Sequence, residues 1–179
     1  MASTEGRSAE GRTAVRVSVP GSGAANVATG LPVLDHLLGL LARYGRFDLS
    51  LEVEPGAAEA EVAAAGRGLG EAVAELLRSG DARRYGAATI PAAEALAHVA
   101  LDASERPLLV SNVDLSQARV AGLGTDLAAR FLEELTDAAG LTLHVRLMEG
   151  HETQHVLEAI FKALGVALAQ ACRPRTRKE

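Results

Sequence analysis

Two stretches of strict alternation between apolar and polar residues dominate the pattern of this chain. Because successive side chains of a strand point to opposite faces, each stretch predicts a strand with one buried face. The inward residues of the first stretch are Phe47, Leu49, Leu51 and Val53, and those of the second, 94 residues later, are Leu141, Leu143, Val145 and Leu147. This recurrence is the first indication of an internal repeat.

Four other segments carry apolar residues at helical spacing. They predict helices over residues 33–44, 62–78, 126–138 and 152–171, the first stopped by Gly45 and the third by Gly140. Glycine readily takes the left-handed conformation that closes a helix. The last helix is expected to be the one around which the rest of the chain packs, because it has an inward stripe formed by Val156, Leu157, Ile160, Phe161 and Leu164.

Shorter strands are predicted over residues 14–19 and 26–28 in the first half and over 97–101 and 107–114 in the second. The second strand of each pair is expected to return beside the first as a hairpin, because turn-forming residues separate them. The order strand–strand–helix–strand–helix then occurs twice. This favours an α+β fold with internally duplicated halves, in which a mostly antiparallel sheet packs against helices on one side.

The domain organisation follows from the repeat. One domain over residues 13–172 is expected to contain the two halves, at about 13–80 and 84–172. A disordered N-terminal segment, residues 1–12, is expected to precede it, and a basic tail, residues 173–179, to follow it. At 179 residues the chain is long enough for one large domain or for two small halves that share a core.

The composition excludes several classes of function. It is typical of a globular protein, with 48% hydrophobic and 23% charged residues and no apolar run long enough to span a bilayer. A net charge of −5 argues against a nucleic-acid-binding surface. The single cysteine, Cys172, argues against a disulfide framework or a cysteine zinc site. The polar N-terminus lacks the apolar segment of a secretory signal, so a cytoplasmic location is expected.

Candidate chemistry gathers on the first turns of the last helix. His155 and Glu158 are three residues apart, so they project from nearly the same face. An imidazole and a carboxylate in this arrangement suit a divalent cation such as Mn²⁺ or Zn²⁺. Lys162, one turn further on, would add a positive charge for a small anionic substrate. The alternative is an ordinary solvated face or helix cap, where the helix dipole favours a glutamate.

Several segments, in the same order and register, resemble the imidazoleglycerol-phosphate dehydratase family from about residue 13 to residue 172. Each of them alone would be a weak signal, but together they extend over nearly the whole chain. They are Thr29–Leu38, Ala42–Leu49, Arg84–Gly86, Pro91–Ala97, Arg106–Pro107, Thr142–His144 and His155–Leu164.

The resemblance implies a lyase of histidine biosynthesis with the ribosomal protein S5 domain 2-like fold. The family removes water from imidazole glycerol phosphate and gives imidazole acetol phosphate. In the family two manganese ions hold the imidazole as an imidazolate and make the ring an electron sink, while a glutamate moves protons. Subunits form trimers and then a 24-mer, with each site made between neighbours. The resemblance therefore implies a homo-oligomer that binds a small phosphorylated metabolite, without nucleic-acid or membrane partners.

The family's site residues are only partly present. His36, His155 and Glu158 match metal ligands, and Glu158 is also the candidate catalytic residue. Arg84, Arg106 and Lys162 match phosphate-binding positions. The other metal positions carry Gln154, Arg130 and, in place of the first His-His-x-x-Glu motif, Glu59, Ala60 and Ala63. Alanine cannot coordinate a metal and a guanidinium repels a cation. Manganese is therefore expected to be lost or reduced to one weak site.

The sequence leaves several functions open. A degenerate paralogue would keep the fold with weak or no family activity, and would bind a phosphorylated metabolite or serve as a structural partner. An active dehydratase would need a rebuilt metal site, to which Glu59 and Glu61 could contribute carboxylates. One weak metal site could instead support another lyase or hydrolase reaction. For Arg84 the alternative to phosphate binding is a charge at a helix exit, and Glu94 is a candidate for orienting a metal ligand.

Overall fold

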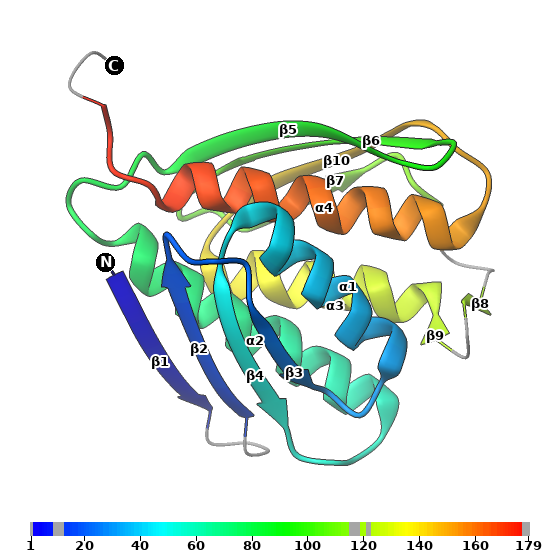
Figure 1. Ribbon diagram of the computed structural model, residues 1–179, viewed down its shortest axis with the longest axis horizontal. Helices are drawn as coiled ribbons and strands as arrows, with labels where there is room; N and C mark the ends of the chain where they lie inside the picture. The colour runs from blue at the N-terminus through cyan, green and yellow to red at the C-terminus, as the bar shows by residue number, and fades with distance from the viewer. Residues whose placement is uncertain (1, 9–12, 115–118, 121–122, 177–179) are drawn as a thin grey trace.

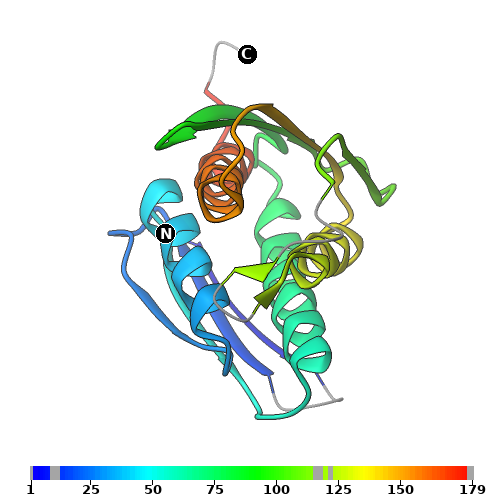
Figure 2. The same cartoon turned by 90° about the vertical axis from the view of Figure 1, so that its right-hand side faces the viewer.

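Four helices lie between two four-stranded mixed sheets in the computed structural model (Figure 1, Figure 2), which describes residues 2–8, 13–114, 119–120 and 123–176. The helices cover the inner face of each sheet, where alternate strand residues are buried. The predicted α+β class, with sheets packed against helices, is confirmed. The helices are α1 (Pro32–Gly45), α2 (Ala58–Leu77), α3 (Thr125–Ala139) and α4 (Thr153–Cys172).

The first sheet has the strand order β1-β2-β4-β3, formed by β1 (Ala2–Ser8), β2 (Thr13–Val19), β4 (Asp48–Val53) and β3 (Ala25–Ala28). β2 pairs antiparallel with both β1 and β4, whereas β3 runs parallel to β4. The hairpin expected between residues 14–19 and 26–28 is therefore wrong. Both edges of β2 are occupied, and α1 is the crossover that a parallel β3–β4 pair requires.

Part of the N-terminal segment for which disorder is expected, residues 1–12, forms a strand; residues 1 and 9–12 lie outside the described residues. Residues 2–8 form β1, which pairs with β2 along its whole length, from Ala2 opposite Val19 to Ser8 opposite Thr13. The outer edge of β2 presents a row of backbone donors and acceptors that an added strand can satisfy even without an apolar pattern of its own.

The second sheet has the equivalent order β5-β6-β10-β7, formed by β5 (Tyr85–Ala92), β6 (Ala95–Asp102), β10 (Thr142–Glu149) and β7 (Leu108–Ser111). The hairpin expected between residues 97–101 and 107–114 is again wrong. β6 pairs with β5 and β10. β7 pairs parallel with β10, and α3 is the crossover that connects these two strands along the chain. A short ribbon of β8 (Arg119–Val120) and β9 (Leu123–Gly124) precedes α3.

The matching strand orders confirm the internal duplication and add one strand to each half. β1 corresponds to β5, and each half ends with a parallel strand–helix–strand unit followed by a second helix. The predicted helices are present with shifted ends. α2 begins at Ala58 instead of Val62, and α1 is followed by Arg46 with φ of 56° and not closed by a left-handed Gly45.

The helices pack in two close pairs, α1 against α4 and α2 against α3. A Cβ atom at Gly165 of α4 would lie 2.2 Å from the Leu41 carbonyl oxygen of α1, and one at Gly66 of α2 would lie 2.7 Å from the Phe131 carbonyl oxygen of α3. Each contact therefore needs a glycine. Phe131 and Phe161 join the two pairs at the centre, with ring centroids 5.5 Å apart.

α4 is the central buried helix, as its sequence predicts. Among the described residues it is the one helix long and apolar enough to cross a membrane, but 67% of its apolar window is buried inside the protein. It lies against β5 and β6 on one side and α1 on the other (Figure 2). Its apolar character is thus that of a core helix.

Candidate active site

The first turns of α1 and α4 meet in a corner that contains the predicted metal ligands, and we call it the α1–α4 corner (His36, Gln154, His155 and Glu158). His36 Nε2 lies 3.1 Å from Glu158 Oε1, and the Gln154 side-chain amide donates a hydrogen bond of 3.1 Å to the same oxygen. The His36 side chain is 55% exposed and that of Glu158 is 17% exposed. The carboxylate is therefore the inner partner and the imidazole faces solvent.

The loop before α1 fixes the position of His36. The Asp35 carboxylate accepts hydrogen bonds from the backbone N–H of Thr29 at 2.9 Å and from its hydroxyl at 2.6 Å. Thr29 is fully buried, and Pro32 in the first turn has the φ that a helix start requires. The stretch Thr29–His36, one of the segments that resemble the family, is thus a device that anchors the start of α1 opposite α4.

The pKa of Glu158 is below its usual value. Partial burial opposes ionisation, but the hydrogen bonds from Gln154 and His36 and the positive charges of His36 and Lys162 together outweigh it. Glu158 is therefore a carboxylate near neutral pH, suited to accept a proton or to bind a cation.

His155 is oriented by Glu94, which lies in the turn between β5 and β6. Its Nδ1 is 2.6 Å from Glu94 Oε2, while Glu94 Oε1 accepts the backbone N–H groups of Glu152 at 2.9 Å and His151 at 3.4 Å. These backbone bonds, from Glu152 above all, and the bond to His155 lower the pKa of Glu94 to about 2. In the tautomer in which His155 Nδ1–H donates a hydrogen bond to the ionised Glu94, Nε2 is the atom left to bind a metal.

The donors of this corner do not form a complete metal shell. Over residues 2–8, 13–114, 119–120 and 123–176, no three His, Cys, Asp or Glu side chains are arranged to hold a metal ion. His36 and Glu158 bind each other, and His155 is one turn away and turned toward Glu94. Within a single chain these residues fit at most a partial coordination sphere, and we derive no catalytic step through a metal.

The first turns of α2 and α3 form the equivalent corner of the other helix pair, and we call it the α2–α3 corner. A groove of about 830 Å³ opens here. It contains four of the five positions at which the resemblance implies a replaced metal ligand, the fifth being Gln154 at the α1–α4 corner, and three further carboxylates accompany them. Its lining is formed by Glu59, Ala60, Ala63, Val113, Asp114, Asp126, Leu127, Ala129, Arg130 and Glu133.

The α2–α3 corner contains no imidazole. Arg130 points its guanidinium to Glu134 at 2.6 Å, and Arg67 binds the other oxygen of the same carboxylate at 3.3 Å. Glu61, considered as a substitute ligand, is buried away from the groove lining and accepts the Gly56 backbone N–H at 2.9 Å. Glu59 does line the groove, next to the alanines.

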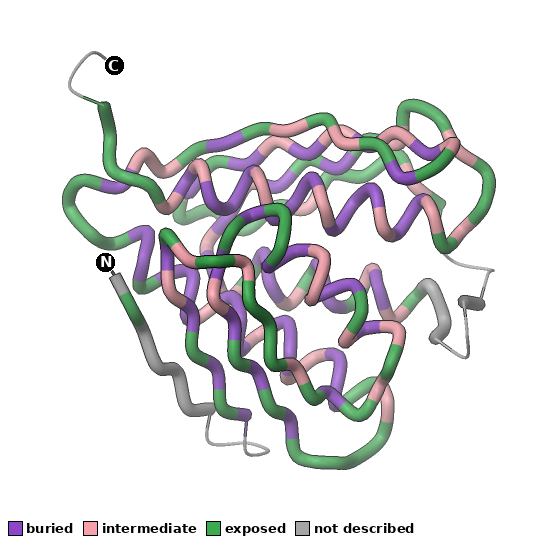
Figure 3. Tube along the Cα trace, in the orientation of Figure 1, coloured by how far each residue is buried: buried purple, intermediate pink, exposed green. Residues whose placement is uncertain are grey.

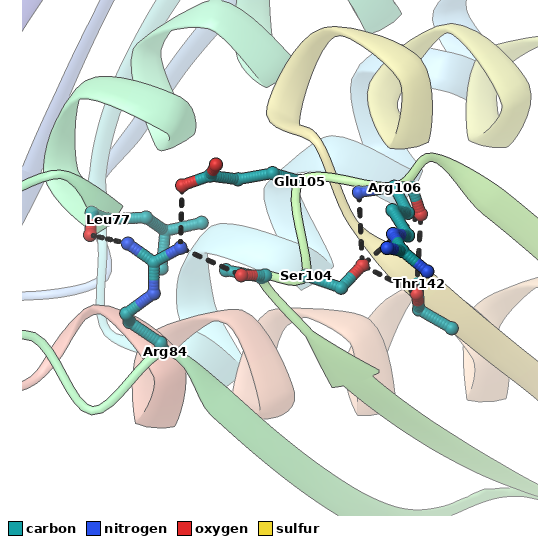
Figure 4. A network of polar contacts seen from close by, with 7 residues as sticks. Leu77, Arg84, Ser104, Glu105, Arg106 and Thr142 are labelled. Atoms are coloured by element: carbon teal, nitrogen blue, oxygen red, sulfur yellow. Dashed lines mark hydrogen bonds and ion pairs between the residues drawn. The ribbon is translucent and has the colours of Figure 1, made fainter.

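The candidate phosphate-binding arginines lie at the far end of the second sheet (Figure 4). Arg84 donates to the carbonyl oxygens of Ala103 at 2.8 Å and Leu77 at 3.4 Å, and pairs with Glu105 at 3.2 Å. The contact with Leu77, the last residue of α2, is the helix-exit role weighed as its alternative. Arg106 follows Glu105, and its backbone is held by the Ser104 and Thr142 hydroxyls.

Lys162 lies apart from these arginines. It is on the exposed side of α4 one turn after Glu158, with Nζ 5.1 Å from the ring centroid of Tyr44. Arg84 lies beside the last turn of α4, where its backbone N–H donates to Ala171. The stretch of α4 from His155 to Ala171 is about 24 Å long at about 1.5 Å per residue. One chain therefore places Lys162 near the α1–α4 corner and both arginines at the opposite end.

The fold and its two corners define a class: internally duplicated α+β proteins whose candidate chemistry lies at helix N-termini. The model of the imidazoleglycerol-phosphate dehydratase family matches residues 29–168. This chain belongs to that family.

Relatives and solved structures agree. The imidazoleglycerol-phosphate dehydratase of Syntrophobacter fumaroxidans is 45% identical over 88% of this chain and 82% of its own length. That of Pelobacter propionicus is 38% identical over 99% of this chain and 93% of its own length. The crystal structure of the Staphylococcus aureus dehydratase superimposes with a TM-score of 0.88 and 29% identity, over 98% of this chain and 100% of that one.

Two contacts of the site were not expected from the sequence. The first is the bond of Gln154 to Glu158, because an amide in place of a histidine indicates only a missing ligand. The second is the pair between Arg84 and Glu105, two residues that both have positive φ, 74° and 61°. Neither positive φ has a signal in the sequence, since glycine is absent at both positions.

Proposed function

We propose that this chain binds a phosphorylated, imidazole-bearing metabolite of the kind that its relatives' name describes. We further propose that it dehydrates that metabolite weakly or not at all. The observation that carries the proposal is the α2–α3 corner, where two alanines and an arginine stand at family metal positions around an acidic groove. The substrate-binding function of the family is retained in this proposal, and the two-metal chemistry is not.

The chemistry explains why the missing donors matter. The proton that leaves during dehydration is attached to a carbon beside an imidazole ring, so its acidity depends on how well the ring accepts electrons. A metal on each ring nitrogen provides that acceptor in the family. The α1–α4 corner offers His36, His155 and Glu158 for one manganese ion, bound weakly because few donors surround it. A second ion at the α2–α3 corner would meet Arg130 and no imidazole.

We also propose that the site is completed by a second copy of the chain in a homo-oligomer. The distance along α4 supports this: the arginines lie about 24 Å from the corner that contains His155. A phosphate held by Arg84 and Arg106 could belong to the same ligand as an imidazole at Glu158 only if two chains contribute. Lys162, on the same helix face as Glu158, would then bind the phosphate from the opposite side.

The decisive experiment measures manganese binding and turnover on the full chain. After removal of metal, calorimetric titration with Mn²⁺ should show at most one weak site per chain, and this site should disappear in His36→Ala. With excess Mn²⁺ and imidazole glycerol phosphate, turnover should be absent or at least about 1,000-fold below that of the Staphylococcus aureus enzyme assayed alongside, because lost ligands each cost more than the 10–100-fold of an outer contact. Two tight sites with comparable turnover would overturn the proposal.

A second candidate, an active dehydratase with a rebuilt metal site, is favoured by one observation. The Glu94–His155 pair and the His36–Glu158 contact are both formed, and a carboxylate that orients an imidazole is typical of metal-binding histidines. The same titration separates the two candidates, because a rebuilt site requires a full complement of manganese.

Ligand binding is tested separately from chemistry. Imidazole glycerol phosphate should raise the melting temperature with or without Mn²⁺, since a ligand that binds only the folded state stabilises it. Arg106→Ala should reduce this protection, with the exposed Arg78→Ala on the loop after α2 as a control for lost positive charge. If Arg106→Ala and Arg84→Lys both leave the protection unchanged, the arginines do not bind the phosphate.

A further inference from the structure

Glu105 is the residue that makes the arginine cluster of this chain unusual. It lies between Ser104 and Arg106 with φ of 61°, a left-handed conformation that a glutamate adopts at a cost. Its backbone N–H donates to the Gly140 carbonyl oxygen at 3.0 Å, so the turn is fixed. Its side chain, 84% exposed, reaches back to place Oε1 3.2 Å from Arg84 Nη2 (Figure 4). The turn therefore directs a carboxylate onto the guanidinium.

Arg84 is held rigidly from its other side. The carbonyl oxygens of Ala103 and Leu77 both accept from the guanidinium, whose side chain is 32% exposed. Neutral carbonyls fix its orientation without cancelling its charge, and Glu105 is the one carboxylate that the described part of the chain brings to it. The guanidinium is thus preorganised, and its anion partner is the more exposed member of the pair.

Arg106 is the second arginine of this end of the sheet, and its guanidinium lies near Ser104, away from the Glu105 carboxylate (Figure 4). Only its backbone is engaged by Ser104 and Thr142, and across the described residues its side chain makes no hydrogen bond or ion pair. The Glu105 carboxylate offsets the charge of the Arg84 guanidinium. If that carboxylate moves away, Arg84 presents an uncompensated positive charge with the fork geometry that phosphate oxygens match.

We propose that Glu105 is a built-in competitor that occupies Arg84 until a phosphate displaces it. This inference rests on the proposed binding of a phosphorylated ligand. It adds that the Glu105 carboxylate pairs with Arg84 when no ligand is bound. An exposed ion pair of this type changes an equilibrium by a factor of about five or less, so a phosphate, which carries more charge than a carboxylate, displaces it readily. The consequence is weaker binding of every anion, by the same factor.

The test compares two anions of different charge on the full chain. Inorganic phosphate at pH 8, mainly a dianion, and acetate, a monoanion, are titrated against wild type and Glu105→Gln, with dissociation constants from NMR shifts. Displacement predicts that Glu105→Gln tightens both anions by the same factor, about three- to five-fold. Glu52→Gln, an exposed glutamate on the outer face of β4, makes the same change in net charge and should tighten neither.

The alternatives give different results. If Glu105 stays in place and acts only through its charge, phosphate tightens by about the square of the factor for acetate, and displacement is wrong. If Glu105→Gln changes neither anion while Arg106→Ala and Arg84→Lys weaken phosphate, Glu105 is not a competitor and the inference fails while the arginine site survives. If the arginine variants also have no effect, the proposed binding function fails at this place.

Discussion

The two helix pairs of this protein have the same construction and different chemistry. At the α1–α4 corner, His36, Glu158 and Gln154 bind one another and Glu94 orients His155. At the α2–α3 corner, equivalent positions carry Ala60, Ala63 and Arg130 around a groove of about 830 Å³. Both pairs are packed through glycine contacts to backbone oxygens. The backbone is thus conserved between the halves while the donors are not.

The comparison shows that the helix packing and the candidate metal residues occupy different parts of each helix. The glycines that determine the helix packing lie in the middle of the helices, whereas the candidate metal residues lie on the first two turns, where His36 is exposed and Glu158 is partly buried. A substitution at an exposed position such as His36 removes no core contact, so it is expected to leave the fold intact. The chain therefore superimposes on a dehydratase with a TM-score of 0.88 although Ala60, Ala63 and Arg130 line its α2–α3 corner.

Restoring donors to the α2–α3 corner should have the largest effect. In Glu59→His/Ala60→His/Ala63→Glu, three donors would project from the first two turns of α2, so Mn²⁺ or Zn²⁺ affinity should rise more than about 100-fold, or about 2.7 kcal/mol. Titration calorimetry measures the change. Ala60→Gln/Ala63→Gln fills the same space with poor donors and should leave the affinity unchanged. If the triple variant also leaves the metal affinity unchanged, the two corners are not equivalent in geometry.

Adding a methyl group to the α1–α4 contact should have the next largest effect. Gly165→Ala brings a Cβ within 2.2 Å of the Leu41 carbonyl oxygen, which cannot move without shifting α1. The free energy of unfolding should fall by about 3 kcal/mol, as for an overpacked core. Gly39→Ala on α1 meets nothing within 4 Å and should instead raise it by about 0.5–1 kcal/mol. Urea unfolding of both variants tests the difference.

The dependence on pH should distinguish Glu94 from other acidic residues. Its pKa falls from 4.5 to about 2 in the folded state, so its contribution to stability is present above pH 4.5 and is lost as the pH falls toward 2. The melting temperature of Glu94→Gln should therefore lie below that of wild type at pH 6, and the gap should narrow as the pH falls from 4.5 and close only below pH 2. Glu52→Gln is the control for the loss of a surface carboxylate. If the difference in melting temperature between wild type and Glu94→Gln is the same at every pH, Glu94 acts without its charge.

The smallest effect on stability is expected for His36→Ala. The pair with Glu158 is exposed on the histidine side, so its loss should change the free energy of unfolding by less than about 1 kcal/mol. Manganese binding at this corner should nevertheless be lost. A large fall in stability measured by urea unfolding would show that His36 has a structural role and would weaken the contrast between first turns and helix centres.

The sequence predicted elements well and strand partners poorly, for physical reasons. The alternation from Phe47 to Val53 predicts a strand with one buried face. β4 occupies this segment, and its alternate residues are buried. Alternation does not say which edge a strand pairs with, so β3 and β7 were assigned to the wrong neighbours. β5 was missed because Tyr85–Ala92 is rich in small residues and has no clear period.

The candidate site was predictable where it depends on residue type along one helix. His155 and Glu158 follow from helical spacing, and His36 follows from the family resemblance. The structure adds the contact of His36 on α1 with Glu158 on α4. The separation of Arg84 from Lys162 was not predictable, because it depends on which end of α4 the loop before β5 approaches. The Glu105 contact depends on a backbone conformation that its residue type does not announce.

The touching backbones at Gly165 and Leu41 have a wider consequence. When bulky side chains separate two helices, a substitution of one of them changes the helix spacing. At Gly165 and Leu41 the two backbones are in direct contact, so no side chain there sets the spacing. Any related sequence that keeps Gly165 is therefore expected to keep the spacing across which His36 and Glu158 face each other. New groups installed on those first turns would find a frame of known dimensions, which makes this protein a natural starting point for engineering metal sites.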